Sequence, residues 1–308
     1  MEMLDFIKKL ELFSPRSGSN ERLACEFLEK ELKKLGIDYV LQDFKNFLPS
    51  YKGFGLKIDG EKIESMPTSF KSGSITEKNL ISSMAVSGRY YEEPNINFNP
   101  YSDSFSLATF YRAPSLAIKR KDVQKVIDAN DIDGYVEVEK APHECSNIIA
   151  GNAANPKNIF ICHYDTVLHG ALDNASGTAI LMELVKKGRN AADMFVFAGC
   201  EELSFDSPVY WGKGYRVLEE GYGDVLDKAN KLVAVDMIGS GEAGLIKDGK
   251  TRLAAFPIQN KELFDKAYIV SVTGNEWLGA YHSHEDRPDL LNSRFLTQGL
   301  ELIEKISK

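Results

Sequence analysis

The chain has 308 residues with a formal net charge of −8 at pH 7, and 43% of its residues are hydrophobic. This length is sufficient for one large α/β domain or for two domains, and the composition is that of an ordinary globular protein. The acidic balance, with a pI of about 5.3, argues against nucleic acid as a partner, because no basic face is evident that would neutralise phosphates.

The amino-terminal sequence predicts neither export nor membrane insertion. The segment MEMLDFIKKLELF carries Glu2 and Asp5 and a helical apolar period, rather than the basic start and unbroken apolar core of a signal peptide. No apolar run approaches the roughly 20 residues that span a bilayer. We therefore expect a cytoplasmic protein with no membrane partner.

The cysteines support the same expectation. Their spacing fits neither a disulfide framework nor a C-x-x-C metal site. Cys162 and Cys200 end apolar runs, where a small buried hydrophobic residue is the ordinary explanation, and this usage suits a reducing cytoplasm. The four cysteines are Cys25, Cys145, Cys162 and Cys200.

The amino-terminal stretch predicts two helices followed by a strand. Apolar residues at helical spacing mark the first helix over residues 4–12, and a second helix begins at Ser19 or Asn20 and ends at Gly36. A strand is expected over residues 37–44.

Residues 45–143 differ in character from the rest of the chain. They are rich in Ser, Gly, Pro, Asn and Tyr, and contain short alternating runs such as GYVEVEK. Turn residues recur at short intervals, which is typical of a small β-rich unit, and one helix-like segment at 122–129 interrupts it. We predict a domain at 45–143 that is inserted into a larger domain formed by residues 1–44 and 144–308.

The carboxyl-terminal part alternates between strands and helices. Continuous apolar runs at 158–163, 194–200 and 231–239 predict buried strands, with helices at 176–188 and from Asn292 to Ile306. This alternation predicts an α/β fold with a mostly parallel central sheet sandwiched by helices. Ligands bind beyond the carboxyl ends of the strands in such sheets, and the three strands end at polar residues: His163, the Glu201-Glu202 pair and Asp236.

Five short polar segments are candidates for a functional site. Each has an ordinary structural explanation on its own, since a lone histidine or a Glu-Glu pair is more often structural than functional. Together, however, they place several carboxylates on one side of one sheet, and desolvating these is costly unless a cation neutralises them. Imidazole and carboxylate ligands suit zinc, and the absence of cysteine from the set favours a catalytic site over a closed structural one. The segments are His163-Tyr-Asp165, Asp173-Asn-Ala-Ser-Gly177, Glu201-Glu202, Asp236 and His282-Ser-His-Glu-Asp286.

In this order, the motifs HYDT, ALDNASG, CEEL, AVDMIG and YHSHEDRPD resemble those of the M28 group of co-catalytic zinc aminopeptidases. The resemblance covers residues 1–44 and the carboxyl-terminal half. It implies a zinc-exopeptidase-like fold and a metallo-aminopeptidase that removes residues from peptides with a free amino terminus. It also implies two zinc ions, for which cobalt or manganese could substitute.

The resemblance assigns roles to individual residues. Asp173 would bridge the two ions, and Glu201 would be the general base that activates the attacking water. Asp165 would hold the imidazole of His163, as metal-binding histidines usually require. The Asp173–Asn174 peptide is expected to be cis by resemblance. The metal ligands that the resemblance implies are His163, Asp173, Glu202, Asp236 and His282.

Several alternatives remain open. His284 stands where relatives often have proline and could replace His282 as a ligand, although the spacing of His282 to Asp286 matches the motif better. The end of the 45–143 region resembles the close of a protease-associated domain, which would wall or lid the cleft, while an oligomer contact is the other possibility. The oligomeric state is left open.

Three other functions compete with the aminopeptidase. A glutaminyl cyclase is an acyltransferase with a single zinc, and such relatives usually lack a counterpart of His163 or Asp236. An M20- or M42-like enzyme has a different motif around the bridging aspartate. A receptor-like relative would have kept the fold and lost its metals.

Overall fold

The computed structural model describes residues 1–85, 91–188, 191–207 and 209–307, and these fold into two compact units. Each unit combines segments that are distant in the sequence. The first unit comprises Met1–Asn46, His143–Trp277 and Asp286–Lys308, and the second comprises Phe47–Pro142 and Leu278–Glu285.

The central sheet of the first unit has the strand order β12-β13-β11-β9-β10-β8-β1. Its inner pairs, β10 with β9, β9 with β11 and β11 with β13, are parallel. Strand β8 is antiparallel to β10, and β12 is antiparallel to β13. The bounds are β1 (Tyr39–Ile58), β8 (Ile132–Gly151), β9 (Asn158–His163), β10 (Met194–Ala198), β11 (Lys231–Val235), β12 (Ala243–Ile246) and β13 (Ala267–Val272).

The sheet is therefore mixed, which corrects the expectation of a mostly parallel sheet. That expectation depended on strand–helix–strand connections, which make neighbouring strands parallel. Strand β8 enters the sheet without such a connection, because only the loop at 152–157 joins it to β9.

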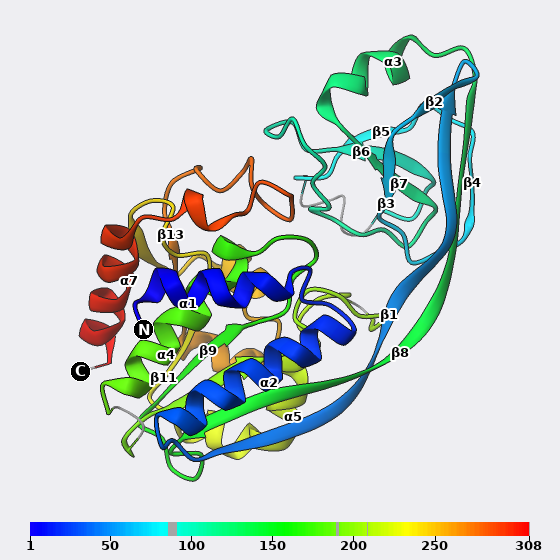
Figure 1. The fold of residues 1–308 in the computed structure, drawn as a ribbon. Coiled ribbons are helices and arrows are strands. Elements are labelled where there is room, and N and C mark those ends of the chain that lie inside the picture. Colours follow the sequence, from blue (N-terminus) through cyan, green and yellow to red (C-terminus); the bar gives the residue numbers. More distant parts are fainter. Residues whose placement is uncertain (86–90, 189–190, 208, 308) are drawn as a thin grey trace. The chain divides into compact units, whose positions relative to one another are not determined.

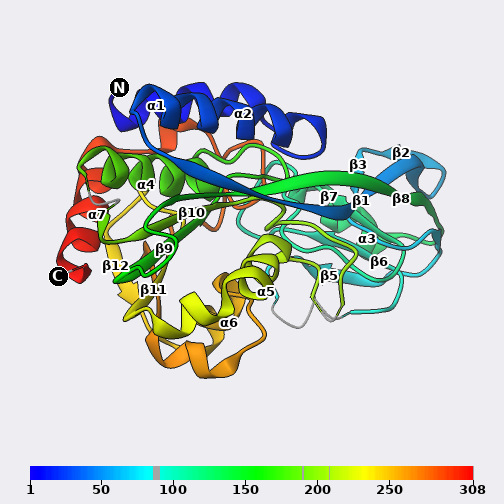
Figure 2. The same ribbon diagram turned by 90° about the horizontal axis from the view of Figure 1, so that it is seen from below.

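Helices cover both faces of this sheet. Figure 2 shows α1, α2, α4 and α7 on one face and α5 and α6 on the other. Side chains of β9 alternate between the two layers: Phe160 and Cys162 pack under the first group of helices, and Ile159 and Ile161 pack under the second. Burial on both faces explains why this strand is continuously apolar. The bounds are α1 (Met3–Leu10), α2 (Ser19–Lys34), α4 (Ser176–Lys186), α5 (Lys213–Lys228), α6 (Gly249–Ala255) and α7 (Ser293–Ile306).

The ends of two predicted elements show local reasons for their positions. Helix α4 ends before Gly188, which adopts a φ of 79°, a left-handed conformation that glycine tolerates. Strand β10 ends at Ala198, earlier than the apolar run suggests, because Cys200 turns out of the strand with a φ of 50°. A positive φ is uncommon for a residue other than glycine.

The second unit contains a separate sheet with the order β3-β7-β6-β5, in which β7, β6 and β5 are parallel and β3 is antiparallel to β7. Strands β1 and β8 continue from the first unit into this one, where β2 pairs with β1 and β4 pairs with β8 (Figure 1). The bounds are β2 (Glu61–Ile63), β3 (Ser65–Pro67), β4 (Gly73–Ile75), β5 (Leu80–Ser82), β6 (Asn95–Phe98), β7 (Ser115–Ile118) and helix α3 (Val123–Asp128).

A transmembrane helix is not found in the part of the chain that the structure describes, where no helix is both long enough and apolar enough to cross a bilayer.

Candidate metal centre

His163, Asp173 and Asp236 meet at the carboxyl-terminal edge of the central sheet. His163 is the last residue of β9, Asp236 follows β11, and Asp173 precedes α4. The Nε2 atom of His163 lies 3.1 Å from Oδ1 of Asp173 and 3.6 Å from Oδ1 of Asp236. Because β9 and β11 are parallel, their carboxyl ends bring His163 and Asp236 together, and the loop before α4 adds Asp173.

The backbone around Asp173 is fixed by the side chain of the next residue. The Asp173–Asn174 peptide is cis, as the family resemblance implied. The Asn174 side chain donates from Nδ2 to the carbonyl oxygen of Val235 at 2.8 Å, and its Oδ1 accepts from the Gly177 amide at 2.9 Å. Asn174 thereby connects the start of α4 to the end of β11, next to Asp236.

Asp286, from the last polar motif, also binds the backbone of the segment that contains Asp173. Its Oδ1 accepts from the Leu172 amide at 2.6 Å, and its Oδ2 accepts from the Asp173 amide at 3.0 Å. Burial raises the pKa of Asp286 well above its usual value against the lowering effect of these amides, and the nearby Asp173 carboxylate raises it further. Asp286 therefore positions Asp173 through the backbone.

Asp165 connects the imidazole to the loop that follows β10. Its Oδ1 accepts from the Glu201 amide at 3.0 Å, and its Oδ2 accepts from the Glu202 amide at 2.9 Å. Nδ1 of His163 lies 3.3 Å from the backbone carbonyl oxygen of Asp165 and 3.5 Å from Oδ1 of the same residue. Asp165 thus contacts the imidazole through both its backbone and its carboxylate, and the carboxylate also holds the Glu-Glu pair.

Glu202 lies close to the group formed by His163, Asp173 and Asp236. In that group, one donor atom from each residue lies within 4.8 Å of the other two. A carboxylate oxygen of Glu202 also lies within 4.8 Å of one from Asp173. Asp173 therefore lies next to His163 and Asp236 as one set of donors, and next to Glu202 in a second set.

The buried carboxylates concentrate negative charge around His163 and Glu201. Burial alone would lower the pKa of His163, but Asp165, Asp173 and Asp236 together raise it well above its usual value. Burial raises the pKa of Glu201 well above its usual value; His163 opposes this shift, and the charge of Glu202 adds to it. A divalent cation would reverse both tendencies, because it favours the deprotonated forms of its neighbours. The donor set therefore fits a metal ion.

His282, the second histidine of the predicted ligand set, belongs to the Leu278–Glu285 segment of the second unit. Its Nδ1 lies 3.2 Å from the carbonyl oxygen of Leu107, and its ring stacks on that of Tyr281 with centroids 4.0 Å apart. In the tautomer that donates from Nδ1, Nε2 is the nitrogen with a lone pair for a metal. His284 lies in the same segment, and the choice between the two stays a prediction.

Sequence patterns did not reveal the role of Arg16. This side chain is fully buried and pairs with Glu11. It donates from Nε to the carbonyl oxygen of Tyr164 at 2.5 Å and from Nη2 to that of Gly170 at 2.8 Å. It therefore holds both ends of the loop between His163 and Asp173. Because these contacts join residues about 150 positions apart in the sequence, no local sequence pattern predicts them.

Cys145 and Cys200 form a disulfide, which corrects the expectation that the cysteines are separate reduced thiols. The physical reason is the antiparallel register of β8 and β10. Phe197 pairs with Ile148, and this register leaves the segment after β10 beside the part of β8 that contains Cys145, so that the turn at Cys200 meets it. Their separation of 55 residues gives no sign of this pairing in the sequence. Cys25 and Cys162 are buried and form no disulfide, and the burial of Cys162 was expected.

Solved structures with this fold include aminopeptidases. An aminopeptidase from Aneurinibacillus sp. strain AM-1 is 18% identical with a TM-score of 0.63, and the match covers 98% of this chain and 91% of the other. The zinc aminopeptidase BSAP from Bacillus subtilis is 16% identical with a TM-score of 0.71, covering 98% and 92%. A glutaminyl cyclase from Porphyromonas gingivalis is 13% identical with a TM-score of 0.52, covering 99% and 96%. At these identities the likeness shows a shared fold.

Comparison with sequence families is more specific. No curated protein matches the chain. The model of peptidase family M28 matches residues 147–269, a stretch that contains four of the five predicted metal ligands and Glu201. Over residues 147–269, this chain is therefore similar in sequence to peptidase family M28.

Proposed function

We propose that this chain is a metallo-aminopeptidase that binds two zinc ions and releases residues from peptides with a free amino terminus. The observation that carries the proposal is the convergence of His163, Asp173 and Asp236 within 4.8 Å of one another. Asp173 also approaches Glu202, and a carboxylate shared by two sets of donors suits the bridging ligand of a two-metal centre.

The proposed ligands divide between the two ions around Asp173. His163 and Asp236 would complete the first ion. Glu202 and His282 would complete the second, His282 being included on the strength of its sequence motif. Imidazole nitrogen and carboxylate oxygen are accepted ligands of zinc, and cobalt or manganese would fit the same donors. Zinc bound here would lower the pKa of a water molecule and polarise the scissile carbonyl group.

Glu201 is the proposed general base. Its side chain is buried, and its backbone amide is held by Asp165. A carboxylate in this position takes the proton of the attacking water and returns it to the leaving amine. Asp165 keeps His163 and the Glu201–Glu202 loop in one arrangement, so it acts as a positioning residue.

The remaining assignments belong to the same proposal. The partner is a peptide substrate rather than nucleic acid or a membrane. Residues 1–44 and 144–308 form the catalytic domain, and residues 45–143 form an inserted, protease-associated-like domain. A cytoplasmic location is compatible with the Cys145–Cys200 disulfide only if that bond is redox-active, because disulfides in reducing compartments are usually catalytic or redox-sensing.

A single-zinc glutaminyl cyclase is the second candidate, favoured by the structural similarity to the cyclase from Porphyromonas gingivalis. Relatives of that type usually lack a counterpart of His163 or Asp236. Both residues are present here, 3.6 Å apart at their nearest nitrogen and oxygen. This pair is the feature that favours two metals and hydrolysis.

Metal stoichiometry tests the proposal. The protein is stripped with a chelator in non-reducing buffer and titrated with zinc, and it is then assayed on aminoacyl anilides and on peptides with amino-terminal glutamine. Two ions per chain with anilide hydrolysis are expected, and Asp173→Asn is expected to weaken binding of both. One ion with cyclisation of glutaminyl peptides would favour the cyclase, and no binding at saturating zinc would overturn both candidates.

A further inference from the structure

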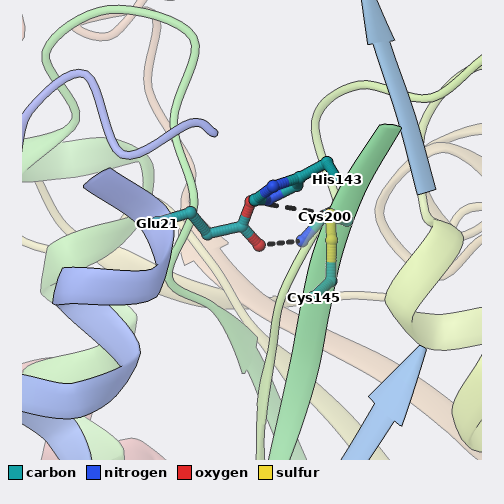
Figure 3. Close-up of side chains that lie close together, drawn as sticks. All are labelled: Glu21, His143, Cys145 and Cys200. Atoms are coloured by element: carbon teal, nitrogen blue, oxygen red, sulfur yellow. Dashed lines mark hydrogen bonds and ion pairs between the residues drawn. A yellow bond between two sulfur atoms is a disulfide. The ribbon is translucent and has the colours of Figure 1, made fainter. Parts of the chain in front are cut away.

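A second cluster of metal-binding side chains lies in the first unit, and the proposed centre does not use it. Glu21 comes from α2, His143 and Cys145 come from β8, and Cys200 follows β10. One donor atom from each of the four residues lies within 4.8 Å of the others. Figure 3 shows the Glu21 carboxylate directed at His143 and Cys200, beside the bond between the two sulfur atoms.

The two oxygens of Glu21 have different environments. Oε1 accepts a hydrogen bond from the Cys200 amide at 2.8 Å. Oε2 lies 2.6 Å from Nε2 of His143 and 3.5 Å from Sγ of Cys200. One oxygen is therefore held by the backbone while the other faces the imidazole and the sulfurs. This is the arrangement of a carboxylate that offers one oxygen to a metal and is oriented through the second.

The strands present the remaining donors from suitable positions. His143 and Cys145 are two residues apart on β8, so their side chains leave the same face of the strand. The Cα atoms of Cys145 and Cys200 are 6.5 Å apart. Both cysteines and Glu21 are buried, and the side chain of His143 is 10% exposed, so a bound ion would be largely shielded from water.

Two sulfurs, one imidazole nitrogen and one carboxylate oxygen form a donor set that zinc binds tetrahedrally. At ordinary zinc–ligand distances, the donor atoms of such a site are about 3.3–3.8 Å apart. The observed spacing within 4.8 Å requires only small side-chain movements to reach this geometry. Breaking the disulfide is the one covalent change needed, since it lets the sulfurs separate to a non-bonded distance.

We propose that Glu21, His143, Cys145 and Cys200 form a redox-gated zinc site that is closed as a disulfide and binds one Zn²⁺ after reduction. A dithiol is the reductant: it delivers two electrons and two protons, becomes a disulfide itself, and leaves Cys145 and Cys200 as thiols. Zinc then displaces the two thiol protons and the proton held between Nε2 of His143 and Oε2 of Glu21, and all three are released to solvent. The product holds two thiolates, one carboxylate and a neutral imidazole around the ion, with a net charge of −1.

The chemistry of the neighbouring groups also supports a metal at this position. A disulfide needs neither a carboxylate nor an imidazole beside it, whereas a zinc ion uses both as ligands. The placement of Glu21 and His143 next to the sulfurs therefore supports a metal site.

The site would act directly on the proposed centre, because Cys200 immediately precedes Glu201 and Glu202. Either the disulfide or the zinc ion would tie this loop to β8. In the reduced, metal-free protein, the Glu21 side chain would still contact Cys200, but no covalent or metal cross-link would remain. This consequence depends on the proposed function, whereas the metal site itself does not.

Cobalt titration tests the site by its sulfur ligands. The full chain is stripped of metal, and its oxidised and dithiol-reduced forms, freed of reductant without air, are titrated with Co²⁺. We expect the reduced protein to bind one more ion than the oxidised protein and to show sulfur-to-cobalt charge-transfer absorption. The proposed aminopeptidase centre has only nitrogen and oxygen ligands, so its success or failure does not affect this band.

Matched variants identify the ligands. Cys145→Ser is expected to abolish both the additional ion and the band. His143→Gln and Glu21→Gln leave the disulfide intact, so that folding of their oxidised forms can be verified by circular dichroism, and each should weaken the additional site by at least about tenfold. Cys25→Ser, which removes another buried thiol of α2, should keep the band. Equal metal binding by the oxidised and reduced protein, or an unchanged band in Cys145→Ser, would overturn the proposal.

Discussion

The Asp165 carboxylate contacts the ends of two neighbouring strands, His163 at the end of β9 and the Glu201–Glu202 amides after β10. Two amide donors fix the plane of this carboxylate, and the imidazole is oriented by the backbone carbonyl oxygen of Asp165 together with the carboxylate. Asp165 orients the ring of His163 through hydrogen-bond geometry, because a negative charge alone would not select one orientation of the imidazole.

Replacing Glu201 by glutamine tests the proposed general base. The change preserves size and leaves the backbone amide bonded to Asp165, but glutamine cannot accept the proton of the attacking water. We expect unchanged zinc binding and a kcat lower by about 10²–10⁴-fold, measured on an aminoacyl anilide with metal content determined in parallel. As a contrast, Glu202→Gln should reduce metal content. A rate close to that of the unmodified enzyme in Glu201→Gln would exclude the role.

Gly177 is required by the close approach of α4 to β11. A Cβ atom at this position would lie 2.4 Å from the carbonyl oxygen of Val235 and 2.4 Å from Oδ1 of Asn174. We expect Gly177→Ala to lower the free energy of unfolding by about 1–3 kcal/mol and to weaken metal binding, because Asp173 would be displaced. Denaturant unfolding and zinc titration measure the two effects. Gly223→Ala, where a Cβ would meet nothing within 4 Å, is the control, and equal effects of both changes would contradict the explanation.

The polar strand-end motifs could be predicted at the residue scale, but their supports could not. His163 and Asp236 stand at the ends of apolar strands, which predicts that they share one edge of the sheet. The role of Asp173 was predicted only from the family resemblance. Arg16 and Glu21 occur in an ordinary polar loop and a helix start. Arg16 contacts Tyr164, and Glu21 contacts Cys200, only when α1 and α2 pack against the sheet.

Strand β8 crosses from one unit to the other within a single element. It runs without a break from Ile132 to Gly151, across the predicted boundary at 143. Its first residues alternate between buried and exposed positions, whereas residues 147–150 are buried without interruption. The first pattern is that of a strand with one covered face and the second is that of a strand covered on both faces. The change of pattern therefore marks a change of environment within one element.

Glu21 makes the attachment of α2 to β8 and to the β10 loop sensitive to pH. Burial raises its pKa from 4.5 to about 7, and the Glu21 carboxylate raises the pKa of His143 against the lowering effect of burial. At pH values between 4.5 and about 7, the folded protein therefore binds more protons than the unfolded chain. The free energy of unfolding consequently falls as the pH rises from about 5 to about 8. At pH 5 this stabilising contribution is largely present, and it is lost as the pH passes the folded-state pKa.

The Glu21→Gln variant isolates this contribution. We expect the oxidised variant to lose less stability than the unmodified protein between pH 5 and pH 8, by about 1–3 kcal/mol. Unfolding in denaturant at several pH values, under non-reducing conditions, measures the difference. Parallel curves for the two proteins would show that the Glu21–His143 pair does not control the pH dependence.

At the scale of the whole molecule, the alternation of apolar runs predicted helices on both faces of one sheet, and this arrangement is present. The directions of β8 and β12 were not predictable, because periodicity indicates which faces of a strand are buried and carries no information on strand direction. Direction follows from the connections, and the link from β8 to β9 is too short to contain a helix.

Metal binding should raise the stability of the entire chain. The proposed ligands come from segments that are far apart in the sequence, so an unfolded chain does not present them together. Zinc at a hundred times its dissociation constant should therefore add about 2.7 kcal/mol to the free energy of unfolding, and a chelator should remove this gain. Thermal unfolding in non-reducing buffer with and without zinc measures the effect, with Asp173→Asn as the control. Identical midpoints in the unmodified protein would argue against binding to the folded state.

The pairing of β1 with β8 has a consequence for how such a chain can change during evolution. These strands are neighbours in the sheet, so the segment between Asn46 and His143 is, in topological terms, the loop of a hairpin. A loop of this kind can be lengthened or shortened by a single event in the gene, without altering the order of the other strands. The long segment at this point thus occupies a position where a turn can grow while the strand order of the first unit is preserved.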